Sequence, residues 1–478
     1  MRNDAHEQID STLAAAREAW QRSDLVHAEA LLRELNGQVP EREDIARLLC
    51  NVLRSQGRLD AASLVALELC GASDFDQGVC LRSAEFARQC DRHAMAARIC
   101  DDALAHGPAT PELLVLAGNV AREAGDFDTA RVRYLRALDA GVDLDRHHVL
   151  GALANVRRYT DAADAEIAWF AKHFSDTRYS PRSRASAGFA LAKAQGDLAD
   201  YARAARTLRE ANAMVRTVQA WNAAGWQAFV TSRVRERVAD ASPVPKDDFN
   251  PVFIVGVPRS GTTLTATLLA RATGARDRGE LRALRFIGEQ LVGGGHLGSP
   301  AALTEAASLY RRLAVQDDAP ATHYLDQDPL NFRWLHIAAA MFPRARVIHL
   351  RRDPRDTALS LWGQDFAHPD MAFAYDFDDM RAYMDGHDAL MRHWTQRLSL
   401  PIFELDYEML VTETESSLTK LRDFIGAPAR GSVPSDDSAP VQSASVWQAR
   451  QPVYATSVGR WRHYVPYVPE LMQFGEPD

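Results

Sequence analysis

A step of 34 residues recurs through the first third of the chain and limits what this part can fold into. One series of small residues keeps the step at four positions, Ala28, Ala62, Ala96 and Ala130. Five positions earlier a second series keeps it, at Ser23, Gly57, Asp91 and Gly125. A fixed period of this length predicts helix–turn–helix units, each of which buries its apolar face only against its neighbours.

The clearest copy covers residues 116–138 and predicts a helix, a turn at Gly125 and a second helix with an aromatic residue at Tyr134. This pattern resembles the tetratricopeptide repeat (TPR). Looser copies near 158–163 and 196–201 bring the count to about six helical pairs. We therefore predict an all-α TPR solenoid over residues 1–239, whose concave surface suits an extended peptide or a partner subunit. Whether it binds, scaffolds or dimerises stays open.

With 478 residues the chain is too long for one hydrophobic core, so we expect more than one domain. Two prolines and mixed polar residues over 240–250 predict a linker, which leaves 251–478 as a second domain. A net charge of −9 argues against general nucleic-acid or membrane binding. No stretch approaches about 20 apolar residues and the N-terminus is polar, which predicts a cytoplasmic protein.

Five cysteines, all in the N-terminal third, form no C-x-x-C pair. The odd count argues against a disulfide framework or a zinc site, so we expect small buried residues on helices. They stand at Cys50, Cys70, Cys80, Cys90 and Cys100.

A second constraint lies at 251–264, where an apolar run stops at Pro258 and a predicted helix begins near Leu264. Gly256 and Gly261 have the spacing of a phosphate-binding loop, in which backbone N–H groups and a helix N-terminus meet an anion. Thr262 occupies the place of the ATP-binding lysine, so Arg259 is the loop's side-chain cation. The alternatives are an ordinary strand–turn–helix connection and a nucleotide kinase or NTPase, which Thr262 disfavours.

A second buried strand at 344–350 also leads into a turn and helix, at 351–362. Two such turns carrying Arg and Ser or Thr predict a parallel α/β sheet that grips a ligand with two separated anionic ends. Asp353 and Asp356 stand among Arg351, Arg352 and Arg355, and we expect local ion pairs that orient this loop.

The two motifs in this order resemble the sulfotransferases, and among them the TPR-linked group related to protein-tyrosine sulfotransferases. The resemblance covers about residues 250–464. It implies a P-loop-type sulfotransferase domain that uses 3′-phosphoadenosine 5′-phosphosulfate (PAPS) and releases 3′-phosphoadenosine 5′-phosphate (PAP). It places the 5′-phosphosulfate on the loop, at Arg259, Ser260, Gly261, Thr262 and Thr263. Arg352 and Ser360 match the positions that bind the 3′-phosphate.

Further positions are implied by the same resemblance. Glu280, which lies 21 residues after Arg259, matches the catalytic glutamate, with Arg259 and Ser445 as the other catalytic groups. The remaining nucleotide contacts would be Tyr407, Ser445, Gln448 and Arg460, the last three in a C-terminal lid. The sequence departs from the family at Gln327, where a lysine stabilises the leaving oxygen. Losing a positioned donor there can cost about a hundredfold in rate.

The resulting interpretation is sulfuryl transfer from PAPS to a hydroxyl of a peptide tyrosine or a small molecule, without a metal. The alternative is a nucleotide-binding scaffold, a pseudoenzyme whose turnover is lost through Gln327. Arg282 and Arg285 face solvent or meet acidic residues beside an acceptor tyrosine. Histidines are candidate bases by type, although His349 lies in a strand and fits the core better; the others are His323, His336, His387 and His393. The acceptor and a possible homodimer stay open.

Overall fold

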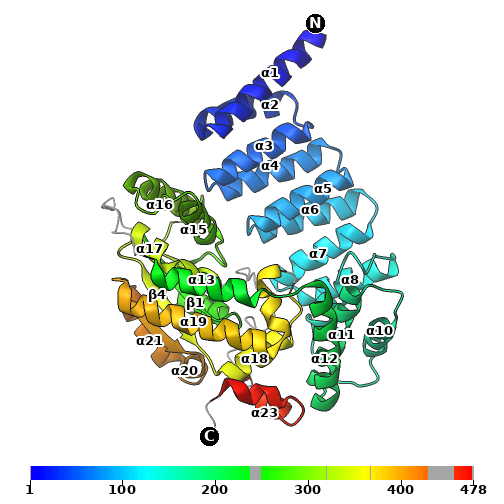
Figure 1. Cartoon of the computed structure of the whole chain (residues 1–478). Coiled ribbons are helices and arrows are strands. Elements are labelled where there is room, and N and C mark those ends of the chain that lie inside the picture. Colours follow the sequence, from blue (N-terminus) through cyan, green and yellow to red (C-terminus); the bar gives the residue numbers. More distant parts are fainter. Residues whose placement is uncertain (1, 237–248, 319, 367, 429–456, 476–478) are drawn as a thin grey trace. The chain divides into compact units, whose positions relative to one another are not determined.

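The computed structural model describes residues 2–236, 249–318, 320–366, 368–428 and 457–475. These residues divide into two compact units (Figure 1). The first, which we call the helical unit, holds residues up to 142 together with 311–320. The second, the sheet unit, holds 143–310 and the described residues from 321 onward. The predicted linker falls mostly at 237–248, outside the described residues, and the helices over 143–236 belong with the sheet.

The helical unit contains four consecutive helical hairpins whose geometry follows the 34-residue step. Its helices are α1 (Arg2–Gln21), α2 (Leu25–Gln38), α3 (Glu43–Ser55), α4 (Leu59–Ala72), α5 (Gln77–Gln89), α6 (His93–His106), α7 (Pro111–Ala124) and α8 (Phe127–Asp139). The second helices of the pairs begin at Leu25, Leu59, His93 and Phe127, one step apart. The four alanines of the first series are all fully buried. The predicted all-helical N-terminal region is thus confirmed.

The turn series explains why small or polar residues recur five positions before each alanine. Ser23, Gly57, Asp91 and Gly125 have φ angles of 62°, 78°, 59° and 84°. Only glycine adopts this left-handed region without strain, and Asp is among the non-glycine residues that tolerate it best. Each hairpin therefore turns through one left-handed residue placed just before its second helix.

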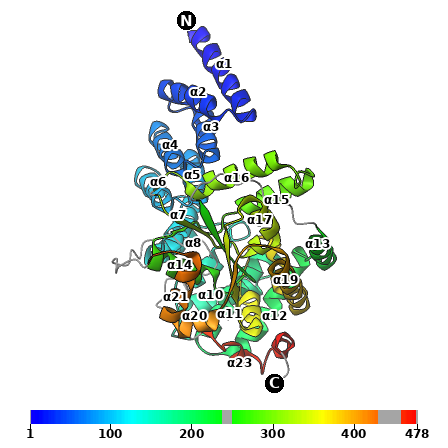
Figure 2. The same ribbon diagram turned by 90° about the vertical axis from the view of Figure 1, so that its left-hand side faces the viewer.

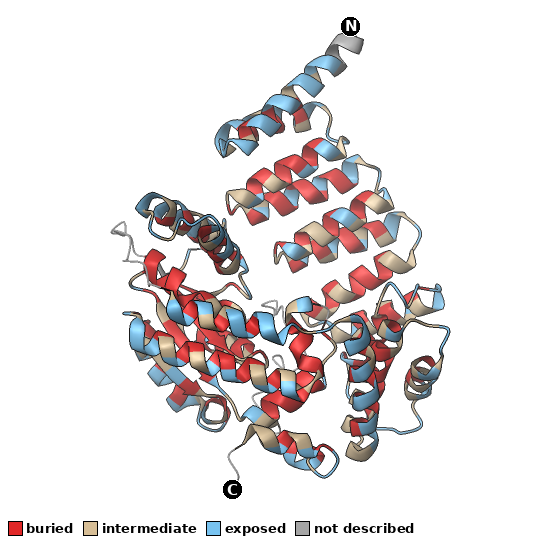
Figure 3. Cartoon of the chain, in the orientation of Figure 1, coloured by how far each residue is buried: buried red, intermediate tan, exposed pale blue. Residues whose placement is uncertain are grey.

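All five cysteines are buried in this unit, as predicted. Figure 3 shows the buried faces of the paired helices turned toward one another. Burial raises the pKa of the Cys50 and Cys100 thiols to about 12, because a thiolate would lose its hydration there. These cysteines act as small apolar residues.

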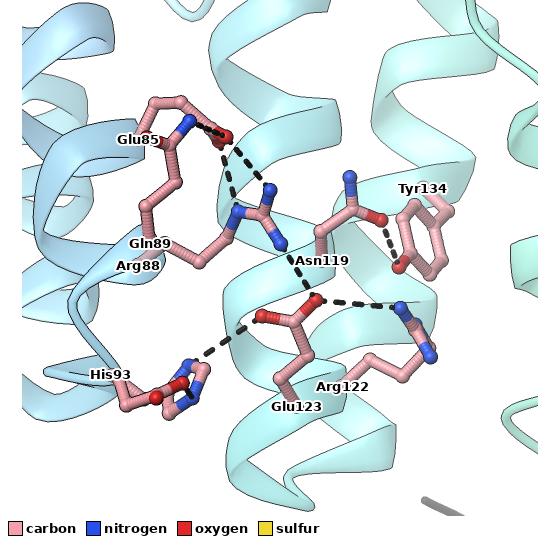
Figure 4. A network of polar contacts seen from close by, with 9 residues as sticks. Glu85, Arg88, Gln89, His93, Asn119, Arg122, Glu123 and Tyr134 are labelled. Atoms are coloured by element: carbon pink, nitrogen blue, oxygen red, sulfur yellow. Dashed lines mark hydrogen bonds and ion pairs between the residues drawn. The ribbon is translucent and has the colours of Figure 1, made fainter. Parts of the chain in front are cut away.

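A buried carboxylate ties three of these helices together (Figure 4). Glu123 of α7 accepts a hydrogen bond of 3.0 Å from Arg88 of α5, and its other oxygen lies 3.4 Å from His93 of α6. Arg122 adds an ion pair of 3.6 Å. The pKa of Glu123 is raised, because the effect of burial outweighs the opposite effect of Arg88 and Arg122. The network fixes how α5, α6 and α7 lie against one another, because removing one partner would leave a buried charge unpaired.

Helix α4 receives its N-terminal cap from a distant stretch of the same unit. Its own N-cap residue, Arg58, makes no side-chain cap. Instead the Asp317 carboxylate accepts the backbone N–H of Asp60 at 2.9 Å and of Ala61 at 3.0 Å. Arg92 lies 3.7 Å from the same carboxylate. Asp317 thus satisfies two N–H groups that have no partner inside the helix.

The sheet unit is built on five parallel strands in the order β2-β3-β1-β4-β5, which confirms the predicted parallel sheet. They are β1 (Asn250–Gly256), β2 (Arg276–Asp277), β3 (His323–Asp326), β4 (Arg346–Arg351) and β5 (Ile402–Asp406). Val252 and Ile254 of β1 pack with Ile348 and Leu350 of β4 in one apolar cluster, fully or almost fully buried. The residues of β1 form a continuous apolar run, because the strands of a parallel sheet are buried on both faces.

The sheet unit also contains many helices; five of them precede the sheet in the chain, and one, at residues 300–315, passes into the helical unit at residue 311. These five are α9 (Val149–Ala154), α10 (Ala165–Ser175), α11 (Pro181–Asp197), α12 (Tyr201–Val218) and α13 (Ala223–Arg235). The others are α14 (Thr262–Thr273), α15 (Ala283–Gly293), α16 (Pro300–Val315), α17 (Leu335–Met341), α18 (Pro354–Trp362), α19 (Phe377–Arg397), α20 (Tyr407–Thr412), α21 (Thr414–Ile425) and α23 (Trp461–Tyr464). Short 3₁₀ helices are η1 (Pro329–Trp334), η2 (Pro369–Tyr375) and η4 (Pro469–Phe474). In the described part of the chain, no helix combines the length and apolar character needed to cross a membrane.

The helices α12 and α13 pack directly on helices of the sheet region. Trp226 of α13 stacks on Tyr383 of α19 at 4.9 Å and donates to the carbonyl of Ala382. A Cβ at Gly386 would stand 2.5 Å from the Trp226 ring, so the close approach requires glycine. Asn212 of α12 donates to the carbonyl of Trp362 at 3.0 Å. This aromatic packing joins α13 to α19.

Candidate active site

The candidate site lies where neighbouring strands β1 and β4 end. The chain leaves β1 toward β2 and β3 on one side of the sheet, and leaves β4 toward β5 on the other. Figure 2 shows the strands with α14 beside them. In open parallel sheets such a reversal separates the two connections and opens a crevice at the carboxyl ends of the strands. The loops 257–261 and 352–353 border this position.

The first loop has the backbone geometry of an anion cradle. Gly261 is the N-cap of α14 with a φ of 110°, and a Cβ there would stand 2.5 Å from the Tyr407 ring. Arg259 adopts a φ of 76°, a left-handed conformation that costs a non-glycine residue free energy. The loop therefore keeps a strained shape directly before the N-terminus of a 12-residue helix, where backbone N–H groups favour an anion.

Three hydroxyl residues of the loop are buried, namely Ser260, Thr262 and Thr263. The Ser260 Oγ atom finds no hydrogen-bond partner among the described residues. Leaving a buried hydroxyl unpaired costs about 1–3 kcal/mol, so such a group indicates a place for an external partner. A phosphate or phosphosulfate oxygen fits this hydroxyl.

The structure brings the second turn against the first. Arg259 Nε donates to Ser360 Oγ of α18 at 3.1 Å, and Arg352 Nη1 donates to the Arg259 carbonyl at 2.9 Å. The Arg352 guanidinium lies 4.6 Å from the centre of the Tyr407 ring. Its Nε is buried and unpaired among the described residues. Four residues singled out in the sequence, Arg259, Arg352, Ser360 and Tyr407, thus meet at the ends of β1 and β4.

A short piece of the C-terminal segment completes this wall. Ser457 accepts at its carbonyl from Arg352 Nη2 at 3.0 Å, and its Oγ lies 2.8 Å from the Tyr407 hydroxyl. The sequence reasoning missed Ser457, since nothing marks one serine among several there. Arg460 is exposed, with its guanidinium 5.8 Å from the Tyr464 ring. Ser445 and Gln448 lie outside the described residues.

Of the two expected aspartate ion pairs, one is present among the described residues. Asp353 pairs with Arg355 at 3.0 Å, whereas the buried Asp356 accepts the backbone N–H groups of Gly459 and Trp461 at 2.6 and 2.9 Å. The prediction for Asp356 was wrong, because its partners come from a segment more than a hundred residues later. Arg351 turns instead to Glu404 and Asp406 of β5, whose side chains are about half-exposed.

Glu280 lies in the loop that follows β2, and its side chain is exposed. The preceding residue, Gly279, has a φ of 64°, donates to Asp277 Oδ1 at 2.9 Å and accepts from the backbone N–H of Gln327 at 2.9 Å. Burial raises the pKa of Asp277 to about 6. The structure thus fixes the backbone beside Glu280 and sets Gln327 next to it.

Gln327 stands in a strongly buried environment between two acidic residues. It is 2% exposed, and its Oε1 atom has no partner among the described residues. Burial raises the pKa values of Asp326 and Asp328 on either side. Tyr310 donates to Asp326 at 2.9 Å. A neutral amide at 327 leaves these two carboxyls without an adjacent cation from this position.

The candidate histidine bases are largely structural. His323, His336, His349 and His387 are buried. His349 lies on β4, as expected of a core residue, and burial followed by the neighbouring His387 lowers its pKa to about 3. Arg285 makes ion pairs with Asp370 and Glu289, while Arg282 is exposed. The described residues contain no cluster of His, Cys, Asp and Glu that could hold a metal ion.

Comparisons with known proteins found one family model and several similar proteins. Residues 251–430 match the model of the Sulfotransferase family. A protein from Aquifex aeolicus (strain VF5), described as an uncharacterized protein, is 32% identical over 327 residues, which cover 62% of this chain and 42% of that protein. The chain therefore spans less than half the length of this curated relative.

Two solved structures share a lower similarity with the chain. The sulfotransferase domain of the Synechococcus PCC 7002 olefin synthase is 20% identical with a TM-score of 0.33, covering 50% of this chain and 99% of that domain. The sulfotransferase domain of the curacin biosynthetic pathway is 16% identical with a TM-score of 0.31, covering 48% and 99%.

Proposed function

We propose that the protein transfers a sulfuryl group from PAPS to a hydroxyl acceptor. The observation that carries the proposal is the meeting of Arg259, Arg352 and Ser360 beside the unpaired Ser260 hydroxyl, within a sulfotransferase-family domain. An unpaired buried Oγ on one turn and an unpaired buried Nε on the other suit a nucleotide that is phosphorylated at two positions.

Each residue has a physical role in this reaction. The loop N–H groups and Arg259 neutralise charge on the departing 5′-phosphate, while Arg352 and Ser360 hold the 3′-phosphate. Glu280 accepts the proton of the attacking hydroxyl, and its exposed position leaves room for an acceptor. A sulfuryl group carries less charge than a phosphoryl group, so this assignment needs no metal ion.

Calorimetry with PAP tests the nucleotide site directly. We expect micromolar binding that Arg352→Ala weakens by about a hundredfold, since a charged hydrogen-bond partner of phosphate contributes about 1.5–3 kcal/mol. Arg351→Ala serves as the matched control, because this neighbouring side chain pairs with β5 instead. Tight Mg·ATP binding with no heat from PAP would overturn the proposal.

A scaffold without turnover is the second candidate, and the buried neutral Gln327 favours it. Gln327→Lys restores a cation next to the loop of Glu280. With a tyrosine-containing peptide or a phenol supplied as the hydroxyl acceptor, a rise in PAP release from PAPS by about a hundredfold would identify a weak enzyme. No release from either protein, combined with normal PAP binding, would identify a scaffold.

The partners of the helical unit follow as proposals from its hairpins. We assign it to the TPR class on the 34-residue helix step and the left-handed turns. Such an array would hold a peptide acceptor, another protein or a second copy of the chain. Pull-down with tyrosine-containing peptides and sedimentation of the full chain separate these cases.

A further inference from the structure

The C-terminal segment, residues 457–475, is fastened to the proposed nucleotide site at its first residues. Ser457 contacts Arg352 and Tyr407 through two hydrogen bonds. Further along the segment, the backbone N–H groups of Gly459 and Trp461 both donate to the Asp356 carboxylate. The Arg355 guanidinium lies 4.1 Å from the Trp461 ring centre. Residues of the β4–α18 turn therefore hold both the nucleotide wall and the start of this segment.

The rest of the segment is held by α12, a helix from the region first assigned to the repeats. Tyr201 stacks on His463 at 4.9 Å and meets Tyr464 edge-on at 5.1 Å. Arg209 forms two hydrogen bonds with the Glu470 carboxylate, at 2.7 and 2.9 Å, and one with the Tyr467 carbonyl at 3.2 Å. Figure 1 shows α23 beside α12 and α18.

The packing beneath these contacts is tight. Tyr464 is 2% exposed, while Val468 and Leu471 are fully buried. A Cβ at Gly196, at the end of α11, would stand 2.8 Å from the Tyr464 hydroxyl. The segment thus packs closely against the hairpin of α11 and α12 and buries apolar side chains there.

We infer that Tyr201 and Arg209 of α12 are positioning residues for the nucleotide site. They hold the C-terminal segment so that Ser457 stays against Arg352 and Tyr407. The inference rests on the proposed function, because it assigns these residues to the site that would bind PAP. It makes the α11–α12 hairpin part of the catalytic unit, although it precedes the sulfotransferase-family match by several tens of residues.

The test combines hydrogen exchange with PAP calorimetry on the full chain carrying Arg209→Ala or Tyr201→Ala. Arg203→Ala is the matched control, since Arg203 lies on the same helix and its ion pair is a local one, with Asp200 at 3.3 Å. We expect faster exchange over 461–471 and PAP affinity about tenfold weaker in both test variants, with neither change in the control. The charge-swapped pair Arg209→Glu with Glu470→Arg should recover most of both.

The outcomes separate this inference from the proposed function. If the test variants exchange faster over 461–471 but bind PAP as tightly as the wild type, the positioning role alone is overturned. Exchange that stays at the wild-type rate would overturn it as well. Wild-type protein that gives no heat with PAP would overturn the proposed function and this role with it. Recovery of both affinity and exchange protection in the charge-swapped pair supports positioning, because it ties both changes to the contact between positions 209 and 470.

Discussion

Acid should destabilise the sheet unit through two buried histidines. His349 lies on β4 and His336 on α17, and they are 6% and 2% exposed. Burial lowers both pKa values to about 3, with His387 adding to the effect at His349 and Arg233 at His336. Replacing either histidine with glutamine removes one titrating group from the core.

The magnitude follows from linkage between protonation and folding. The folded state keeps both rings neutral until the pH approaches 3, whereas the unfolded chain binds a proton on each near its ordinary pKa of 6.5. The burial of the two neutral rings therefore stabilises the folded state fully above pH 6.5. This stabilisation is lost as the pH falls from 6.5 toward 3. Between about pH 7.5 and pH 5 each histidine removes about 2 kcal/mol of unfolding free energy.

Urea unfolding followed by tryptophan emission measures this loss. Seven of the nine tryptophans are described residues of the sheet unit, so the signal reports mainly its unfolding. We expect the loss between the two pH values to shrink by about 2 kcal/mol in His349→Gln and in His336→Gln. His296→Gln is the control, because His296 is exposed. If His349→Gln loses as much stability in acid as the wild type, the burial argument is refuted.

Three further predictions concern the loop, its neighbour and the helical unit. Gly261→Ala places a methyl group in a left-handed position against Tyr407, so PAP affinity should fall by about tenfold or more in calorimetry, whereas Gly298→Ala, in open space, should not change it. Tyr407→Phe removes the hydroxyl contact with Ser457 and should weaken PAP binding by about fivefold; unchanged affinity would contradict the wall described above. Asp317→Ala removes the cap of α4 and should cost about 1 kcal/mol, read as faster amide exchange at Asp60 and Ala61.

The features that could be predicted from the sequence are those set by local chemistry. The 34-residue step fixes helix starts because each hairpin repeats the same left-handed turn and the same buried alanine. Gly261 of the first loop likewise marks a left-handed backbone position, with a φ of 110° that favours glycine. Arg259 and Arg352 meet because parallel strands end at one edge of the sheet.

Long-range pairings could not be predicted in the same way. Asp356 stands among arginines, yet its carboxylate binds backbone groups of Gly459 and Trp461. Backbone N–H groups carry no residue signature, so no pattern pointed to them. The helices over 143–236 have apolar faces like those of the first hairpins, and amphipathicity alone does not say which surface covers them.

The capping of α4 by Asp317 also orders events during synthesis. The carboxylate lies 257 residues after the Asp60 amide that it receives. At about 5–20 residues per second, the ribosome delivers it roughly 13 to 51 s after that amide. The hairpins leave the ribosome in chain order. In the second hairpin, the backbone N–H groups of Asp60 and Ala61 lack their carboxylate acceptor until residue 317 has left the exit tunnel. Translation pauses before codon 317 would prolong that interval.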